Sequence, residues 1–114
     1  YQRGFKELKP STKQRFSALS FNYPETKQEI EILINETEID ADNAKKLVAI
    51  GSKIRNLTEL GLTETVSTRL LVNAATLIKS GLPKRLSTHI AIVEPLTDDL
   101  QTVQSLKDLC DLMI

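Results

Sequence analysis

The stretch from Gly61 to Gly81, GLTETVSTRLLVNAATLIKSG, constrains the fold of this 114-residue chain more than any other. Its apolar residues recur at helical spacing and fall on one broad face: Val66, Leu70, Leu71, Ala74, Leu77 and Ile78. The opposite face carries Arg69, Asn73, Thr76 and Ser80. Thr65 or Ser67 can cap the start of a helix, and Gly81 can adopt the positive φ that ends one. The sequence therefore predicts an amphipathic helix that packs through one face.

Arg69 lies in the first turn of this predicted helix, on the side away from the core. The positive end of the helix dipole disfavours a cation there by about 0.3–1 kcal/mol. A site that holds an anion nearby would explain such a cation. An exposed arginine is more often simply solvated or salt-bridged, so the spacing alone leaves both interpretations open.

Three segments together resemble the C-terminal part of MoxR-group AAA+ ATPases, in the CbbQ/NirQ/NorQ branch. They are the stretch from Gly61 to Gly81, PLTDD at 95–99 and LKPSTKQRF at 8–16, so the resemblance covers nearly the whole chain. It implies that the STR triplet carries the sensor 2 arginine, Arg69, which contacts nucleotide phosphates in cis. It also implies that Arg15, in the RF pair, is an arginine finger offered in trans to a neighbouring subunit. A surface cation before a strand is the alternative interpretation of Arg15.

The beginning of the chain suggests a piece of a longer protein, because it starts at Tyr1 and opens with little helical pattern. The resemblance implies that a nucleotide-binding α/β core lies upstream. The chain contains no G-x-x-x-x-G-K-[ST] motif and no apolar strand that ends in paired acids. We therefore expect the parent to use ATP and Mg²⁺, and we expect the fragment alone to bind neither and to be inactive.

One strand is predicted near the start of the chain, where FSALSFNY at 16–23 alternates between two faces. No other segment offers it a convincing partner, so it is expected to be the last strand of the missing core's sheet. Pro24 suits the first turn of a helix but not the inside of a sheet. We accordingly place residues 1–23 at the end of the core and residues 24–114 in a helical lid domain.

The predicted fold class is mainly α, a lid bundle of about five helices. Besides the helix that ends at Gly81, we expect Pro24–Thr37, Ala41 to about Leu60, Pro83 to about Glu94, and Asp99–Met113. Pro95 is expected to stop the fourth helix, and Gly51 is expected to permit close helix packing. Inward residues are expected on each helix: Ile30, Leu33, Ile34 and Thr37; Ala44, Leu47, Val48, Gly51, Ile54 and Leu57; Leu86, Ile90 and Val93; Leu100, Val103, Leu106, Leu109 and Cys110.

Other catalytic chemistry finds little support in the residues. His89 is the only histidine and Cys110 the only cysteine, so neither a zinc site nor a histidine-based triad can be assembled. We expect His89 on a helix surface and Cys110 in the core as a small apolar residue. The pairs Glu29 with Glu31 and Asp98 with Asp99 are interpreted as solvated charges at helix ends.

The charge balance and the hydropathy of the chain limit the classes of partner and the cellular location that we expect. The 15 basic and 15 acidic residues balance, which disfavours a nucleic-acid or anionic-membrane surface. No run of about 18 apolar residues and no signal-peptide pattern is present, so a cytoplasmic protein is expected.

The resemblance implies a parent that assembles as a homo-oligomeric ring and acts as a chaperone-like activator. Its partners would be a protein with a von Willebrand factor A domain and a client metalloenzyme, such as ribulose bisphosphate carboxylase or nitric oxide reductase. The alternative hypothesis is a free-standing helical module that binds protein and has no nucleotide role. It predicts exposed apolar anchors at helical spacing.

Overall fold

The computed structural model describes residues 23–57 and 65–114, and these residues are mainly helical. The helices are α2 (Thr26–Thr37), α3 (Ala41–Arg55), α4 (Thr68–Lys79), α5 (Lys84–Thr88), the π-helix η2 (His89–Val93), α6 (Glu94–Leu96) and α7 (Leu100–Met113). No strand occurs within the described ranges. The predicted strand lies outside them except for Tyr23, which is not in a strand. None of the described helices is long and apolar enough to cross a membrane.

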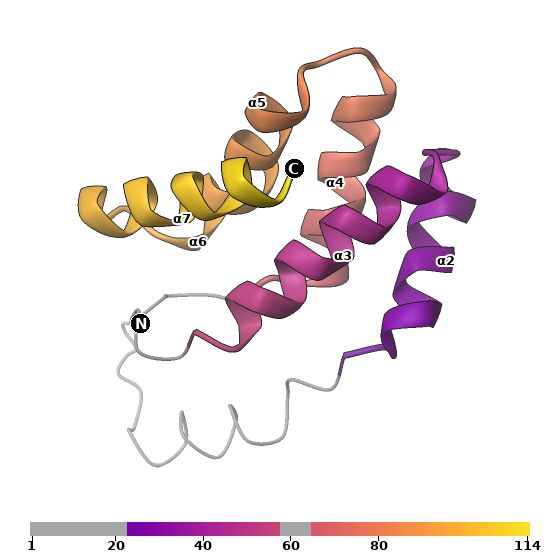
Figure 1. The fold of residues 1–114 in the computed structure, drawn as a ribbon, viewed down its shortest axis with the longest axis horizontal. Coiled ribbons are helices and arrows are strands. Elements are labelled where there is room, and N and C mark those ends of the chain that lie inside the picture. Colours follow the sequence, from indigo (N-terminus) through magenta and orange to yellow (C-terminus); the bar gives the residue numbers. More distant parts are fainter. Residues whose placement is uncertain (1–22, 58–64) are drawn as a thin grey trace, which may run out of the picture.

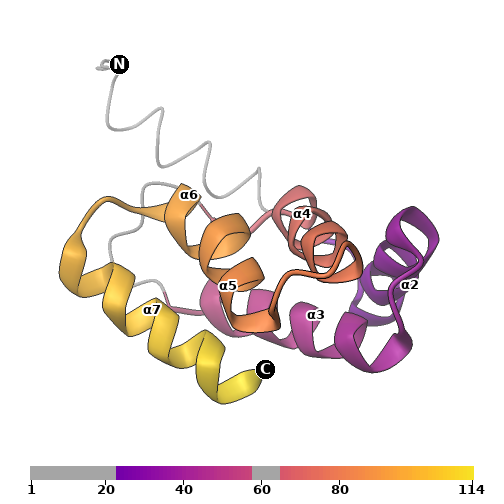
Figure 2. The ribbon, with the colours of Figure 1, turned by 90° about the horizontal axis from the view of Figure 1, so that it is seen from above.

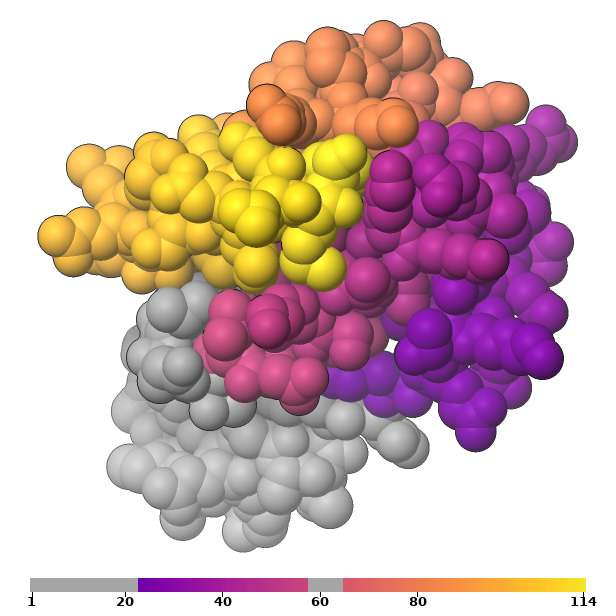
Figure 3. All heavy atoms as spheres, in the orientation of Figure 1, coloured from indigo at the N-terminus to yellow at the C-terminus, as the bar shows by residue number. Residues whose placement is uncertain are grey.

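Helices α3 and α4 form the centre of the bundle (Figure 1). Helix α2 packs against both of them at one end, and α7 lies beyond α3 towards the other end (Figure 2). The continuous segment α5–η2–α6 fills the space between α4 and α7. Figure 3 shows α7, in yellow, lying against α3 on one face of the molecule. The domain is therefore built from helix-on-helix packing around one core.

The core draws on every described helix except α5, whose buried residues are the polar Ser87 and Thr88. Its members are Leu33, Ile39, Ala44, Leu47, Val48, Ile50, Ile54, Val66, Leu71, Ala74, Ala75, Ala91, Ile92, Val93, Leu96, Leu106 and Cys110. Gly51 lets α3 and α4 approach closely, since a Cβ at that position would lie 3.1 Å from Leu71 Cδ1. The predicted packing role of Gly51 is thus confirmed.

Side chains cap three helices as their chemistry dictates. Ser67 accepts a hydrogen bond from the amide of Leu70, and Gly81 follows α4 with φ 112°. Asp40 accepts from the Asn43 amide, which lowers the pKa of Asp40 below its usual value. Asp99 accepts from the hydroxyl and the amide of Thr102, and these bonds lower the pKa of Asp99. These helix starts follow the sequence closely.

Helix α3 ends earlier than predicted. Its last residue is Arg55, and Asn56 occupies the C-cap, whereas the sequence pattern suggested a helix to about Leu60. The amide of Leu57 bonds to the carbonyl of Ile54, three residues back, which is the tighter turn that often closes a helix.

The fourth predicted helix differs most from expectation. It runs from Lys84 to Leu96 without stopping at Pro95, and it widens to π geometry at His89–Val93. The amide of Glu94 bonds to the carbonyl of His89, five residues back. Proline has no amide hydrogen, and its ring crowds the carbonyl four residues before it, so a widened turn just ahead of Pro95 is one way for the helix to continue past it.

Three residues predicted to point inward are exposed instead. Leu86 and Ile90 lie on the outer side of the α5–η2 segment, and Ser87, Thr88, Ala91 and Ile92 are buried in their place. An extra residue in the π turn shifts the face that a regular 3.6-residue repeat would bury.

Leu100 is 82% exposed because it is the first residue of α7, at the end that projects from the bundle.

Candidate functional site: the N-terminal end of α4

Arg69 lies in the first turn of α4 and its side chain is exposed, as predicted. It makes no hydrogen bond or ion pair with any residue in the described ranges. Two residues further on, Leu71 is fully buried against α3. The helix is thus anchored through its apolar face, and Arg69 lies on its exposed face.

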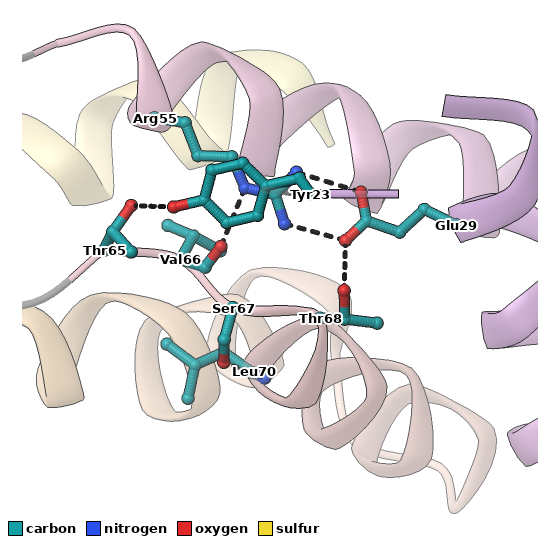
Figure 4. Close-up of polar contacts among 8 residues, drawn as sticks. All are labelled: Tyr23, Glu29, Arg55, Thr65, Val66, Ser67, Thr68 and Leu70. Atoms are coloured by element: carbon teal, nitrogen blue, oxygen red, sulfur yellow. Dashed lines mark hydrogen bonds and ion pairs between the residues drawn. The ribbon is translucent and has the colours of Figure 1, made fainter. Parts of the chain in front are cut away.

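A buried ion pair lies beside this helix end (Figure 4). Arg55, the last residue of α3, donates from Nη1 and Nη2 to the two carboxylate oxygens of Glu29 on α2, at 3.0 and 2.7 Å. The exposed fraction is 1% for the Glu29 side chain and 9% for that of Arg55. This two-pronged geometry is the strong form of an arginine–carboxylate contact, and burial protects it from water.

The same two side chains hold the segment that leads into α4. Arg55 Nε donates to the carbonyl of Val66 at 2.7 Å, and the hydroxyl of Thr68 donates to Glu29 Oε2 at 2.8 Å. Helices α2 and α3 therefore fix residues on both sides of the cap Ser67 (Figure 4).

Tyr23 completes the cluster from the segment before α2. Its ring lies against the Arg55 guanidinium, with 3.8 Å between the guanidinium carbon and the ring centroid. Its hydroxyl donates to Thr65 Oγ1 at 2.7 Å. The ring adds cation–π attraction to a guanidinium that is already desolvated.

The prediction of Glu29 as a solvated charge is wrong. Glu29 lies four residues before the buried Leu33, and Arg55 lies four residues after the buried Gly51. Both charges thus continue the buried stripes of their own helices, and this spacing was the signal available in the sequence. Glu31, Asp98 and Asp99 are exposed as expected, with Asp99 serving as a cap.

The remaining candidate residues do not join this site. Arg15 lies outside the described residues, so its predicted role as an arginine finger stays a prediction. His89 is half-buried rather than on an open surface, and its Nε2 lies 2.8 Å from Asp111 Oδ1. Cys110 is fully buried, as predicted, and burial raises the pKa of its thiol to about 11. The described residues contain no cluster of three potential metal ligands.

A shallow groove of about 500 Å³ has none of the residues of this site in its lining. It is lined by Thr26 and Ile30 of α2, by Met113 of α7, and by the outer side of α3, including Lys45 and Lys53. Sequence reasoning did not identify it, because it forms where three helices meet.

The family to which the chain belongs is decided by its sequence relatives. The sequence model of the family described as CbbQ/NirQ/NorQ C-terminal matches residues 29–113. The chain belongs to this family. The match extends from Glu29 through Arg55, Thr68 and Arg69 to α7, so it includes the site just described apart from Tyr23.

Individual relatives are similar in sequence to this chain over most of its length. The denitrification regulatory protein NirQ of Pseudomonas aeruginosa is 46% identical over 114 residues, which is 100% of this chain and 44% of NirQ. NorQ of Paracoccus denitrificans is 45% identical over 109 residues, or 96% of this chain and 40% of NorQ. CbbQ of Hydrogenophilus thermoluteolus is 46% identical over 99 residues, or 87% of this chain and 37% of CbbQ. The chain thus spans less than half the length of these relatives.

This CbbQ-type domain presents a cation at the positive end of a helix dipole, above a charge cluster that is internally paired. Glu29 is occupied by Arg55 and Thr68, so it does not neutralise Arg69. The arrangement suits an anionic ligand that approaches the first turn of α4 from outside the domain.

Proposed function

We propose that this chain is the helical lid of a MoxR-group AAA+ ATPase, and that Arg69 is its sensor 2 arginine. Membership of the CbbQ/NirQ/NorQ family supports the parent's class. The observation that carries the role of Arg69 is its exposed, unpaired side chain among the described residues, at the start of a helix whose other face is buried.

The proposed chemistry is electrostatic. Hydrolysis of ATP develops negative charge around the γ-phosphate, and a fixed guanidinium stabilises that charge in a site from which water is excluded. The upstream core of the parent would bind the phosphates and Mg²⁺, and Arg69 would complete the site in cis when the lid closes. The fragment alone has no phosphate-binding loop.

Substitution of Arg69 in the parent tests this role. Arg69→Ala should lower ATP turnover by about a hundredfold, the loss seen when one charge-stabilising donor is removed from an active site. Arg85→Ala, which removes another exposed arginine of this domain, is the matched control and should leave turnover unchanged. Unchanged turnover in Arg69→Ala would overturn the proposal. Calorimetric titration of the fragment with ATP and Mg²⁺ should show no binding.

Arg15 is proposed to act in trans within a homo-oligomeric ring. An Arg15→Ala subunit would keep an intact site of its own, which a neighbour carrying Arg15 could complete. An Arg69→Ala subunit could not be rescued in this way. Mixing each variant with subunits that lack the magnesium-binding acid distinguishes the two roles, since recovery of ATPase activity is expected only with Arg15→Ala.

We further propose that the parent is a chaperone-like activator of a metalloenzyme, working with a partner that carries a von Willebrand factor A domain. The name of NirQ, a denitrification regulatory protein, supports a regulatory role of this kind. Activity of the client enzyme, measured with and without the parent, its partner and ATP, provides the test. ATP-independent activation would contradict it.

A second candidate function, binding of a partner protein without any nucleotide role, is favoured by one observation. Leu86 and Ile90 are exposed and lie four residues apart, which is the anchor spacing that this alternative predicts. Leu86→Ser with Ile90→Ser should then abolish complex formation, while Arg69→Ala should have no effect on any activity of the parent. Loss of ATPase activity in Arg69→Ala favours the first function.

A further inference from the structure

The residue immediately before Arg69 is held by a different helix. Thr68 is the first residue of α4, and its hydroxyl donates to Glu29 Oε2 on α2 at 2.8 Å. The first turn of a helix lacks internal partners for its amides and tends to fray. A side-chain bond from residue 68 into the buried part of the domain opposes this fraying at the position that sets the direction of Arg69.

Glu29 is itself fixed, so the bond has a rigid anchor. Arg55 binds both carboxylate oxygens of Glu29 and also binds the carbonyl of Val66, just before the cap. One carboxylate and one guanidinium thereby hold residues 66 and 68 together, with Ser67 between them (Figure 4).

Stability alone does not account well for such a pair. Removing two charges from water is costly, and buried ion pairs can often be replaced by well-packed apolar side chains without loss of stability. The contacts of the pair fit a role in fixing the geometry of the start of α4. Arg55 binds the backbone carbonyl of Val66, and Glu29 binds the side chain of Thr68.

We propose that Glu29, oriented by Arg55, is a positioning residue that acts through the Thr68 hydroxyl to aim Arg69. This inference rests on the proposed function of Arg69. The cluster confines the first turn of α4, so the guanidinium of Arg69 meets the nucleotide phosphates in one geometry. A displacement of about 1 Å at a reacting centre can lower a rate by about a hundredfold.

The test uses the full-length parent and three threonine variants. Thr68→Val removes the hydroxyl but keeps the shape of the side chain, and Thr68→Ser keeps the hydroxyl. Thr76→Val is the matched control, because Thr76 lies on the exposed face of α4 and its hydroxyl donates only to the carbonyl of Val72 in its own helix.

Thr68→Val should lower kcat for ATP hydrolysis by about tenfold, the factor expected when a hydrogen bond to a charged group is lost. The KM for ATP should change by less than about twofold, because the misdirected cation fails mainly in the transition state. Thr68→Ser and Thr76→Val should retain the parental kcat. A merely structural role would instead lower the melting temperature and leave kcat per folded molecule unchanged.

A double variant shows whether the effect passes through Arg69. In an Arg69→Ala background, Thr68→Val should cause no additional loss of kcat. An additional tenfold loss there, or parental kcat in Thr68→Val alone beside a slow Arg69→Ala, would overturn the positioning role and leave the proposed function intact. Parental kcat in Arg69→Ala would overturn the proposed function itself, and the positioning role with it.

Discussion

Gly51 of α3 and Leu71 of α4 meet so closely that a Cβ at position 51 would lie 3.1 Å from Leu71 Cδ1. Leu71 is fully buried and has little room to move. Gly51→Leu should therefore lower the free energy of unfolding by about 1–3 kcal/mol through overpacking. Ser52→Leu, at the neighbouring exposed position, should change it by less than about 0.5 kcal/mol. Denaturant titration measures both, and equal effects would contradict the close contact.

Because Glu29 and Arg55 form a buried ion pair, we expect the losses in the free energy of unfolding on substituting them to be non-additive. Glu29→Ala or Arg55→Ala alone should lower the free energy of unfolding by about 3–5 kcal/mol, because each leaves an unpaired buried charge. Glu29→Leu combined with Arg55→Met should cost much less than the two single changes added together.

The exposed pair of Asp42 with Lys46 serves as the control for this cycle. Its atoms lie 3.4 Å apart across one helical turn, and Lys46→Ala should cost less than about 0.5 kcal/mol. Additive losses at Glu29 and Arg55 would show that the two side chains act independently.

The Cys110 thiol predicts a loss of stability at alkaline pH. Burial raises its pKa from about 9 in the unfolded chain to about 11, so the folded domain holds the thiol proton more tightly. The stabilising contribution is complete below pH 9 and is lost as the pH rises towards 11, by about 2–3 kcal/mol. Cys110→Ala removes this dependence, so the stability difference between parent and variant should shrink above pH 9.

Reactivity offers a second measurement on Cys110. A thiol reagent should modify it at neutral pH only as fast as the domain opens, because the thiol is buried and protonated. Rapid modification of the folded domain would contradict its placement in the core.

Because two helices are capped by aspartates, we expect the folded domain to lose stability at acidic pH. Their hydrogen bonds lower the pKa values of Asp40 and Asp99, so the stabilisation they provide is complete above about pH 4 and is lost as the pH falls further. Asp40→Asn keeps a capping oxygen and should remove the part of this pH dependence that comes from Asp40, whereas Asp40→Ala should destabilise the domain at neutral pH as well. Unfolding curves recorded from pH 2 to 7 test both. If the acid-induced loss of stability is unchanged in Asp40→Asn, the Asp40 cap does not contribute to it.

The fold could be predicted where local chemistry and hydrophobic spacing agree. Helix α4 follows its sequence signals closely, from the Ser67 cap to the positive φ of Gly81, and Arg69 lies on the face that the spacing assigns. The helices α2 and α7 likewise start within two residues of their predicted positions.

The site could be predicted only in part, because its cluster depends on contacts across helices. Arg69 was identified from a motif, but Glu29 and Arg55 lie 26 positions apart, and no local pattern reveals that they meet. A charge on a buried stripe is ambiguous until its partner is known. The inward faces at Leu86 and Ile90 were wrong for a related reason, since one wide turn changes a periodicity that sequence analysis assumes to be constant.

The π-helical turn at His89–Val93 absorbs one residue without redirecting the chain beyond it. Such a turn holds one residue more than an α-helical turn, so deleting a single residue within it should leave a regular helix whose later residues keep nearly the same faces. Leu96 should then stay in the core, and α7 should still place Leu106 and Cys110 against the bundle. A deletion inside the regular helix α4 would instead rotate every later residue by about 100°, so the length of the chain is less constrained at the π turn than in the helices around it.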